Sequence, residues 1–244
     1  MKQKTAVIIG ASTGIGAETA IKLSNEYKNI AITSFRHTRQ LADVQKKILE
    51  NGADCYMESG DAGDFEFIRQ FISNVVERFG NEISLLVNNA GISYIGLLTD
   101  MDITDWEHVM NTNLTSVFNS CSQVIPYMVQ AQKGRILNVS SVWGKVGASC
   151  EVAYSASKGA VNAFTKALAK ELAPSHISVN AIAFGAIDTT MNAHLTVEEK
   201  EDLEEEIPAG RMGTVEEAAE FIASLAKSGT YLTGQVISFD GGWQ

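Results

Sequence analysis

The sequence predicts an α/β fold of the doubly wound Rossmann type, with one seven-stranded parallel sheet and helices on both of its faces. Two observations carry this prediction. Short apolar runs rich in β-branched residues alternate with longer segments of helical periodicity along the whole chain. A glycine-rich turn joins the first of these runs to the first helical segment. No repeat or linker interrupts the pattern, so residues 1–244 are expected to form one domain.

The first half of the chain is expected to supply four strands with a helix after each of the first three. The predicted strands are 4–9, 30–34, 53–58 and 84–87, and the predicted helices are 17–23, 38–50 and 64–79. In the helix 64–79, apolar side chains recur at helical spacing and are expected to be core. These side chains are Phe65, Ile68, Phe71, Ile72, Val75 and Val76.

The second half continues the alternation and contains one departure from it. The expected elements are a long helix 104–131, strand 135–140, helix 153–173, strand 177–182, helix 214–226 and strand 235–239. Residues 186–212 fit neither pattern, and an insertion of this size near the strand ends is typical of a substrate lid. Its acidic run, Glu198 to Glu206, is alternatively the solvated face of a helix.

The composition excludes several classes of protein. An apolar fraction of 45% and a charged fraction of 20% are typical of a globular chain that buries a sizeable core. There is no apolar run of membrane-spanning length and no secretory leader pattern. Three widely spaced cysteines, Cys55, Cys121 and Cys150, indicate reduced thiols, so a cytoplasmic location is expected. The net charge of −10 argues against a nucleic-acid partner, and the four histidines lack metal-ligand spacing.

The turn Gly10-Ala11-Ser12-Thr13-Gly14-Ile15-Gly16 is the first candidate binding site. Glycine at position 10 permits a tight turn, and the later glycines let the backbone approach a ligand closely. The amides at the start of the following helix then face an anion such as a pyrophosphate. The spacing is G-x-x-x-G-x-G, and the alternative is a glycine-rich turn with no function.

The end of the second predicted strand predicts which dinucleotide binds. In a dinucleotide fold, an acidic residue about twenty positions beyond the glycines binds the adenosine ribose. Here the zone reads Ser34-Phe35-Arg36-His37-Thr38-Arg39 and has no carboxylate. A guanidinium suits a 2′-phosphate, so Arg36 predicts NADP(H) over NAD(H), unless it is only a solvated loop arginine.

Tyr154 and Lys158 stand four residues apart in a predicted helix, so both lie on one face. A free tyrosine has a pKa near 10 and exchanges protons poorly at neutral pH. A neighbouring ammonium favours the phenolate and is expected to lower the pKa of Tyr154. The pair is therefore a candidate acid/base device, and the alternative is an amphipathic helix with a surface tyrosine.

Taken together, these motifs resemble the short-chain dehydrogenase/reductase family, most of all the 3-oxoacyl-(acyl-carrier-protein) reductases. The likeness runs from Thr5 to Trp243. Beyond the Gly10–Gly16 loop and the Tyr154/Lys158 pair, it rests on Asn88-Asn89-Ala90-Gly91, Asn111-Thr112-Asn113-Leu114, Ser141, Tyr231-Leu232-Thr233-Gly234-Gln235 and Asp240-Gly241-Gly242.

The resemblance implies four catalytic residues, each with its own role. Tyr154 would exchange a proton with the carbonyl oxygen, and Ser141 would hydrogen-bond that oxygen. Lys158 would lower the pKa of Tyr154 and hold the nicotinamide ribose, and Asn113 would hold a water that links Lys158 to solvent. The resemblance also implies a cofactor site made of Gly10, Ser12, Thr13, Gly14, Ile15, Gly16, Arg36, Asp61, Asn89, Ala90, Gly91, Tyr154, Lys158, Gly185, Ile187 and Thr189.

The expected activity is NADP(H)-dependent reduction of a ketone to a secondary alcohol, with a 3-oxoacyl thioester as the leading substrate. Alternatives are a reductase of steroid, sugar or other small ketones and, outside the enzymes, a dinucleotide sensor without catalysis. The mostly apolar pocket is expected to be lined by Ser93, Tyr94, Val142, Trp143, Cys150, Glu151, Phe184 and Met191.

Two sequence features depart from the family pattern. Phe184 stands where the family usually has proline, and its ring is expected to stack on the nicotinamide or to reshape the substrate wall. Carrier-protein reductases tend to present basic residues at the active-site mouth, whereas Lys133 is the one certain cation in the comparable stretches here. Docking of an acyl carrier protein is therefore left open. A homotetramer, paired through helices 104–131 and 153–173 and the last strand, is also implied.

Overall fold

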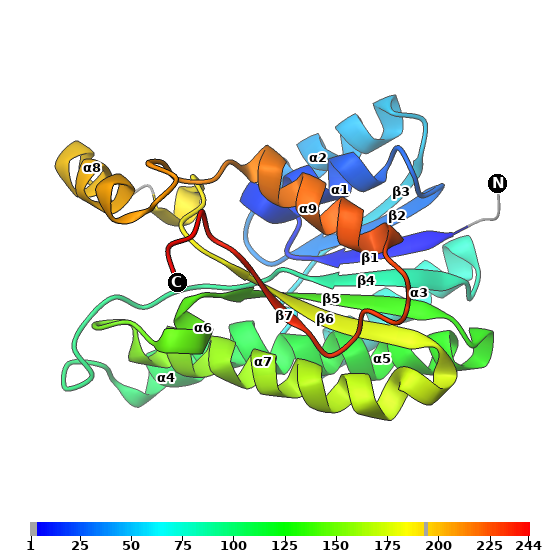
Figure 1. The fold of residues 1–244 in the computed structure, drawn as a ribbon. Helices are drawn as coiled ribbons and strands as arrows, with labels where there is room; N and C mark the ends of the chain where they lie inside the picture. Colours follow the sequence, from blue (N-terminus) through cyan, green and yellow to red (C-terminus); the bar gives the residue numbers. More distant parts are fainter. Residues whose placement is uncertain (1–3, 193–194) are drawn as a thin grey trace.

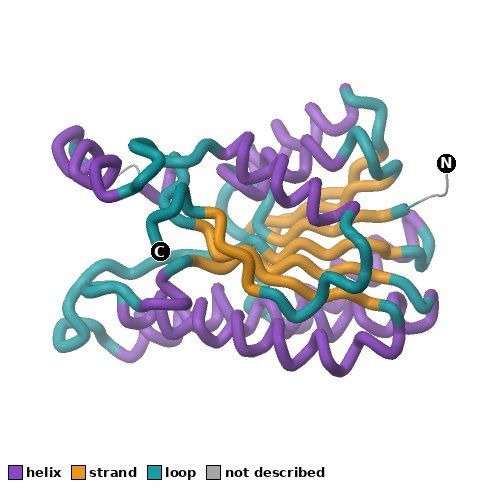
Figure 2. The backbone as a smooth tube through the Cα atoms, in the orientation of Figure 1, coloured by secondary structure: helices purple, strands orange, loops and turns teal. Residues whose placement is uncertain are grey.

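The computed structural model describes residues 4–192 and 195–244. Seven parallel strands form one sheet in the order β3-β2-β1-β4-β5-β6-β7, and helices cover both of its faces (Figures 1 and 2). The predicted doubly wound α/β fold is confirmed. The strands are β1 Thr5–Ile9, β2 Asn29–Ser34, β3 Asp54–Ser59, β4 Ile83–Asn88, β5 Gly134–Ser141, β6 Ile177–Phe184 and β7 Val236–Phe239.

Two helical layers cover the sheet. The first layer is α1 Gly14–Leu23, α2 Thr38–Glu50 and α9 Val215–Lys227, which bury their apolar side chains against one face. The second layer is α3 Phe65–Phe79, α5 Ser116–Ala131 and α7 Val152–Leu172, which pack on the other face. Most strands are buried on both sides, as the continuous burial of β1 and β6 shows. Near-continuous apolar runs are what a parallel sheet between two helical layers requires.

The chain order reverses at β1, which lies between β2 and β4. In an open α/β sheet, ligands bind beyond the carboxyl ends of the strands at such a switch point. The glycine turn leaves β1 there, and the segment beginning at Asn89 leaves β4 beside it. Figures 1 and 2 show the loops of this edge gathered on the left, together with α8 and the C-terminus.

A chain of buried side-chain hydrogen bonds fixes the middle strands beneath that edge. The Asn88 amide on β4 donates to Asn138 Oδ1 on β5 over 2.9 Å, and Asn138 Nδ2 donates to Thr165 Oγ1 on α7 over 2.9 Å. From α5, Ser120 Oγ donates to Asn88 Oδ1 over 2.6 Å. Buried amides that are fully paired rigidify a core, so β4, β5, α5 and α7 hold one fixed arrangement.

The predicted single helix 104–131 is wrong in its middle. The segment is α4 Ile103–Met110, then a π-helical turn η1 Asn111–Thr115, then α5. A π-turn adds a residue to the helix and frees side chains for other bonds. Here Ser116 Oγ donates to the Thr112 carbonyl over 2.5 Å, and Asn113 turns inward to the loop that follows β4. Asn113 therefore sits on the widened turn.

The predicted lid, 186–212, contains two short helices, η3 Thr190–Asn192 and α8 Val197–Glu206; its residues 193 and 194 lie outside the described residues. All ten residues of α8 are described and none is buried. The interpretation of the acidic run as a solvated helix face is therefore confirmed. A capping box between Thr196 and Glu199 begins α8. Its far end is anchored by Ile207, which is 3% exposed.

The C-terminal tail joins the lid to the sheet edge. The Ala209 amide donates to the Gly241 carbonyl over 3.1 Å, and the Gly185 amide donates to the Phe239 carbonyl over 3.0 Å. Trp243 packs edge-on against Trp143 of the short helix α6 Trp143–Val146, with ring centroids 4.8 Å apart. Within the described residues, no helix is long and apolar enough to cross a membrane.

Candidate active site

The glycine turn after β1 is shaped by close contact with the chain after β4. Gly10 has a φ of +84°, and a Cβ on it would lie 2.6 Å from both the Cα and the amide nitrogen of Ala90. The Asn89 side chain donates to the Gly10 carbonyl over 2.7 Å. Only glycine accepts this backbone angle and this approach without strain. Gly10, Asn89 and Ala90, all predicted cofactor residues, are thus in direct contact.

The start of α1 has the geometry of an anion site. Thr13 occupies the N-cap position, yet its side chain makes no capping hydrogen bond within the described residues. The first amides of α1 are therefore free for an acceptor, and the helix dipole favours a negative charge there. Thr189 of the lid faces this point, since a Cβ on Gly14 would lie 3.5 Å from its methyl group. These residues fit a dinucleotide pyrophosphate.

The end of β2 presents cations without a carboxylate. Arg36 is exposed and its guanidinium lies over the Phe35 ring, 5.3 Å from the centroid. Neither Arg36 nor Arg39 belongs to an ion pair in the described part of the chain. Ser34 Oγ donates to Ser12 Oγ over 2.8 Å and so ties this strand end to the glycine turn. Of this zone the sequence singles out Arg36; the same charge argument applies to Arg39.

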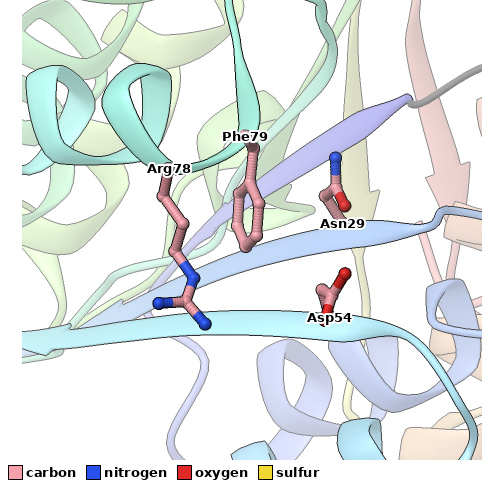
Figure 3. A pocket seen from close by; sticks show the side chains of 4 residues that line it. All are labelled: Asn29, Asp54, Arg78 and Phe79. Carbon is pink, nitrogen blue, oxygen red and sulfur yellow. The ribbon is translucent and has the colours of Figure 1, made fainter.

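A groove of about 270 Å³ lies between α1 and α2. Ser12 and Gly14 line it from the glycine turn, and Gln40 and Lys47 line it from α2. The groove therefore adjoins the predicted nucleotide site at the glycine turn. A smaller hollow, about 210 Å³, lies at the opposite edge of the sheet and is lined by Asn29, Asp54, Arg78 and Phe79 (Figure 3). Asn29 and Asp54 begin their strands, so this hollow is remote from the carboxyl edge.

Other predicted cofactor residues lie along the same carboxyl edge. Asp61 follows β3, and its carboxylate accepts from the Gly63 amide over 2.8 Å. Gly185 directly follows β6, and a Cβ there would lie 2.8 Å from Asp240 Cβ, so the tail passes close. Ile187 is 4% exposed and pairs with Gly213 in a parallel bridge. Ile187 is therefore held by its side chain in the core, with its backbone at the edge.

Helix α7 brings Tyr154 and Lys158 to one place. Lys158 Nζ lies 5.6 Å from the centroid of the Tyr154 ring, as expected for residues one turn apart on one face. The lysine is 3% exposed, and its ammonium donates to the Val139 carbonyl of β5 over 2.9 Å. Helix α6 approaches α7 closely at this point, since a Cβ on Gly144 would lie 2.6 Å from the Lys158 carbonyl carbon.

The pKa values of this pair differ from the sequence-based expectation. Burial raises the pKa of Tyr154 to about 12; a hydrogen bond with Ser141 lowers it, and the Glu151 charge raises it. Burial also lowers the pKa of Lys158 to about 8. Desolvation disfavours the charged form of each group. The expected lowering of the Tyr154 pKa below its ordinary value is therefore wrong: burial has the largest effect on this group and raises its pKa.

Ser141 and Asn113 stand beside the pair. Ser141 ends β5, is 6% exposed, and accepts from the Trp143 amide over 3.2 Å. Asn113 is fully buried: its Oδ1 accepts from the Ile92 amide over 2.8 Å and its Nδ2 donates to the Ile92 carbonyl over 2.9 Å. A Cβ on Gly91 would lie 3.3 Å from Lys158 Nζ and 3.5 Å from Asn113 Oδ1. Gly91 therefore lies between them.

The predicted substrate residues fall into two groups. Ser93, Tyr94, Cys150 and Glu151 lie on the two loops near Tyr154, and Ser93 Oγ donates to Glu151 Oε2 over 2.6 Å. Trp143 packs on Trp243, a residue that no sequence signal marked, and Met191 on the lid is 43% exposed.

Val142 and Phe184 are buried instead. Phe184 is 4% exposed and its ring packs against Phe239, with centroids 5.6 Å apart. Its ring belongs to the core on the α9 side of the sheet. Stacking of Phe184 on a nicotinamide stays a prediction that this packing does not favour.

The described residues contain no group of three or more His, Cys, Asp or Glu side chains that could hold a metal ion. At the carboxyl edge, Ser141, Tyr154 and Lys158 present polar groups, with Asn113 beneath them. Together these groups can hold and protonate a carbonyl oxygen.

Residues 4–200 match the family described as short chain dehydrogenase. The uncharacterized oxidoreductase YmfI of Bacillus subtilis is 37% identical over 242 residues, which cover 98% of each chain. The 3-oxoacyl-(acyl-carrier-protein) reductase FabG of Thermotoga maritima is 39% identical over 245 residues, covering 99% of this chain and 98% of the other. A variant of actinorhodin polyketide ketoreductase, crystallised with NADPH, superposes with a TM-score of 0.93 at 32% identity, over 99% and 97% of the two chains.

Proposed function

This chain belongs to the short-chain dehydrogenase family, and on that premise we propose that it is an NADP(H)-dependent oxidoreductase that reduces a 3-oxoacyl thioester to the secondary alcohol. The observation that carries the proposal is the meeting of Ser141, Tyr154 and Lys158 at the carboxyl edge of the sheet. The glycine turn lies at the same edge, where a dinucleotide binds in folds of this kind.

The proposed chemistry needs one proton from the protein. A bound NADPH would supply the hydride to the carbonyl carbon. Tyr154 gives its phenolic proton to the carbonyl oxygen, and the Ser141 hydroxyl donates a hydrogen bond to that oxygen as negative charge develops. The Lys158 ammonium stabilises the tyrosinate that remains. Asn113 is a positioning residue, because its amide holds the Ile92 backbone and Ser157 in place.

The dinucleotide would be held by the turn Gly10–Gly16 with Asn89, and its 2′-phosphate by Arg36 with Arg39. Arg36 and Arg39 form no ion pair with any residue that the structure describes, and no carboxylate stands between Ser34 and Arg39; both observations support NADP(H) over NAD(H). Because a carboxylate repels the 2′-phosphate and accepts ribose hydroxyls, Arg36→Asp is expected to cut the preference for NADPH at least tenfold.

The cofactor test compares kcat/KM for NADPH and NADH in the wild type and in Arg36→Asp. Lys133 precedes β5 and therefore lies at the opposite edge of the sheet, so the expectation that its stretch borders the active-site mouth is wrong. Lys133→Asp is the matched control, since Lys133 is remote from the site and is also exposed. A wild type that prefers NADH would contradict the assignment of Arg36. Equal ratios in the wild type and Arg36→Asp would contradict it as well.

A 3-oxoacyl thioester is proposed because relatives that span nearly the whole chain are named as 3-oxoacyl-(acyl-carrier-protein) reductases, and a structural neighbour is named as a polyketide ketoreductase. The charge of α8 restricts how a carrier can dock, because this helix presents an exposed acidic surface beside the expected mouth. An acidic carrier protein would have to approach away from α8. We propose the acyl thioester as the substrate, and an acyl carrier protein that approaches away from α8 as its carrier.

The activity test follows NADPH oxidation with acetoacetyl thioesters of coenzyme A and of acyl carrier protein, against a panel of steroid, sugar and small ketones. Turnover of the thioesters with the highest kcat/KM supports the proposal. If only another class of ketone is turned over, the thioester proposal is contradicted and that class contains the substrate. Binding of NADPH with no turnover of any ketone would instead favour a dinucleotide sensor.

The oligomeric state and location are further parts of the proposal. Ile103 on α4 and Phe118 on α5 are 69% and 52% exposed, and both lie on the segment through which the homotetramer is expected to pair. Large exposed apolar groups on one segment are typical of an interface. Free thiols at Cys55, Cys121 and Cys150 support a cytoplasmic location.

A further inference from the structure

Two loops that flank Tyr154 are tied together by a carboxylate. Ser93 follows β4, and Glu151 directly precedes α7, one turn before Tyr154. Ser93 Oγ donates to Glu151 Oε2 over 2.6 Å. The Gly96 amide donates to the Cys150 carbonyl over 2.8 Å, so the backbones of the two loops are joined as well. The carboxylate therefore has a fixed position beside the candidate proton donor.

Glu151 has no structural partner that accounts for its charge. It holds the N-cap position of α7, but its side chain makes no capping hydrogen bond. Within the described residues it forms no ion pair, and its one side-chain hydrogen bond is the bond from Ser93. A half-buried carboxylate normally has a cation or several donors around it. One carboxylate oxygen of Glu151 thus remains available as an acceptor.

We propose that the Ser93–Glu151 pair is a substrate-recognition site, which accepts a hydrogen bond from a neutral donor near the ketone and rejects substrates that carry a carboxylate there. This inference rests on the proposed function. A hydrogen bond to an ionised acceptor is about twice as strong as one between neutral groups. A substrate carboxylate at the same place would meet a like charge in partly dry surroundings and would be repelled.

The donor that this site would take is an amide N–H or a hydroxyl. Thioesters built on a pantetheine-type arm carry amide N–H groups a few bonds beyond the reacting carbonyl, whereas a free 3-oxo acid carries a carboxylate in place of the thioester. The pair would therefore distinguish the thioester from the free acid. This is a specificity role, separate from proton transfer by Tyr154.

The same charge acts on Tyr154. Glu151 raises the pKa of Tyr154 by its charge and thereby helps to keep the phenol protonated for reduction. Lys158 lies one turn further along α7, with its Nζ 5.6 Å from the centroid of the Tyr154 ring. On the neighbouring elements, Lys145 of α6 donates to Ser238, and the lid charges Asp188 and Lys200 pair with each other. The other charged side chains on the described elements that pack against α7 are Arg135 of β5, which donates to the Ala226 and Ser228 carbonyls, and Asp105, Glu107 and His108 of α4.

The deciding variants are Glu151→Gln and Ser93→Ala, with Glu171→Gln as the control, because Glu171 is an exposed carboxylate at the far end of the same helix. The substrates are the acetoacetyl thioester of N-acetylcysteamine, which carries an amide N–H, and free acetoacetate. In Glu151→Gln, the ratio of kcat/KM for thioester to that for acetoacetate is expected to fall about tenfold. In Ser93→Ala, which keeps the charge but frees its position, a smaller fall of about threefold is expected.

Two further readouts separate recognition from a general structural effect. The basic limb of the pH profile for reduction is expected to move down by about 0.5 to 1 pH unit in Glu151→Gln, because Tyr154 then loses its proton more easily. Calorimetry of the same two ligands with the NADP⁺ complex measures discrimination without turnover. A wild type that binds both ligands but turns over neither would contradict the proposed function and leave this inference standing. If the ratio of thioester to acetoacetate, in kcat/KM and in affinity, is the same in Glu151→Gln as in the wild type, this inference is contradicted and the proposed function is not.

Discussion

Lys158→Met is expected to make the ligand-free protein more stable while it removes activity. Lys158 is buried, and burial brings its pKa from 10.5 to about 8. Below pH 8 the folded chain must bury an ammonium, which in the unfolded chain is hydrated. Methionine has a similar length and no charge, so it avoids this cost.

The magnitude follows from the shift in pKa. At pH 7 a depression of this size corresponds to about 3 kcal/mol of lost folding free energy, since one pKa unit is worth about 1.4 kcal/mol. The hydrogen bond from Lys158 to the Val139 carbonyl stabilises the wild type by about 1 kcal/mol, and the variant lacks it. The free energy of unfolding of the variant should therefore exceed that of the wild type by about 2 kcal/mol. Between pH 8 and 10.5 the unfolded chain binds more protons at this site than the folded chain, so wild-type stability rises with pH there. By pH 9.5 the advantage of the variant should have nearly vanished.

The assay is urea unfolding of the ligand-free wild type and variant at pH 7 and pH 9.5. Lys166→Met is the control, because Lys166 is an exposed lysine on the same helix and should leave stability unchanged at both pH values. The comparison between variant and wild type cancels the titration of other groups. A variant that is less stable than wild type at pH 7, or an advantage that grows toward pH 9.5, would refute the reasoning.

Two other substitutions test the site and the assembly. Gly10→Ala places a methyl against Ala90 and is expected to lower the free energy of unfolding, measured in urea, by at least about 2 kcal/mol. The control Gly80→Ala has nearly the same φ and nothing within 4 Å of the added methyl, so it should lower that free energy by about 1 kcal/mol. Equal losses in the two variants would contradict the close approach of Gly10 to Ala90. The wild type is expected to scatter light with a mass of four times the 26.3 kDa chain, and Phe118→Glu is expected to have a smaller mass. The control Leu49→Glu, on α2, should keep the wild-type mass. A wild type that is a monomer would contradict the proposed tetramer.

Much of the fold follows from local pattern. The alternation of strands and helices predicts the parallel sheet with helices on both faces, and the glycine turn predicts one binding segment, because a right-handed βαβ unit has few alternatives. Helix α2 was bounded correctly by its apolar spacing at Leu41, Val44 and Ile48. Placing the Tyr154/Lys158 pair on one face needed only helical geometry.

The remaining features depend on contacts between distant segments. The π-turn at Asn113 exists because its amide bonds to Ile92, 21 residues away, and no local propensity signals it. The packing of Trp243 on Trp143 joins residues that are 100 positions apart. The direction of the Tyr154 pKa shift could not be predicted from spacing, because its largest cause is burial in the folded chain.

The central claim is that Tyr154 gives the proton that completes reduction of a ketone. It is tested most directly by single-turnover NADPH oxidation with an acetoacetyl thioester in the wild type, in Tyr154→Phe and in the control Tyr127→Phe on α5. Tyr154→Phe is expected to lower the rate by about 10² to 10⁴-fold with NADPH binding unchanged, and the control should match the wild type. A Tyr154→Phe enzyme that works within a few-fold of the wild type would contradict the account.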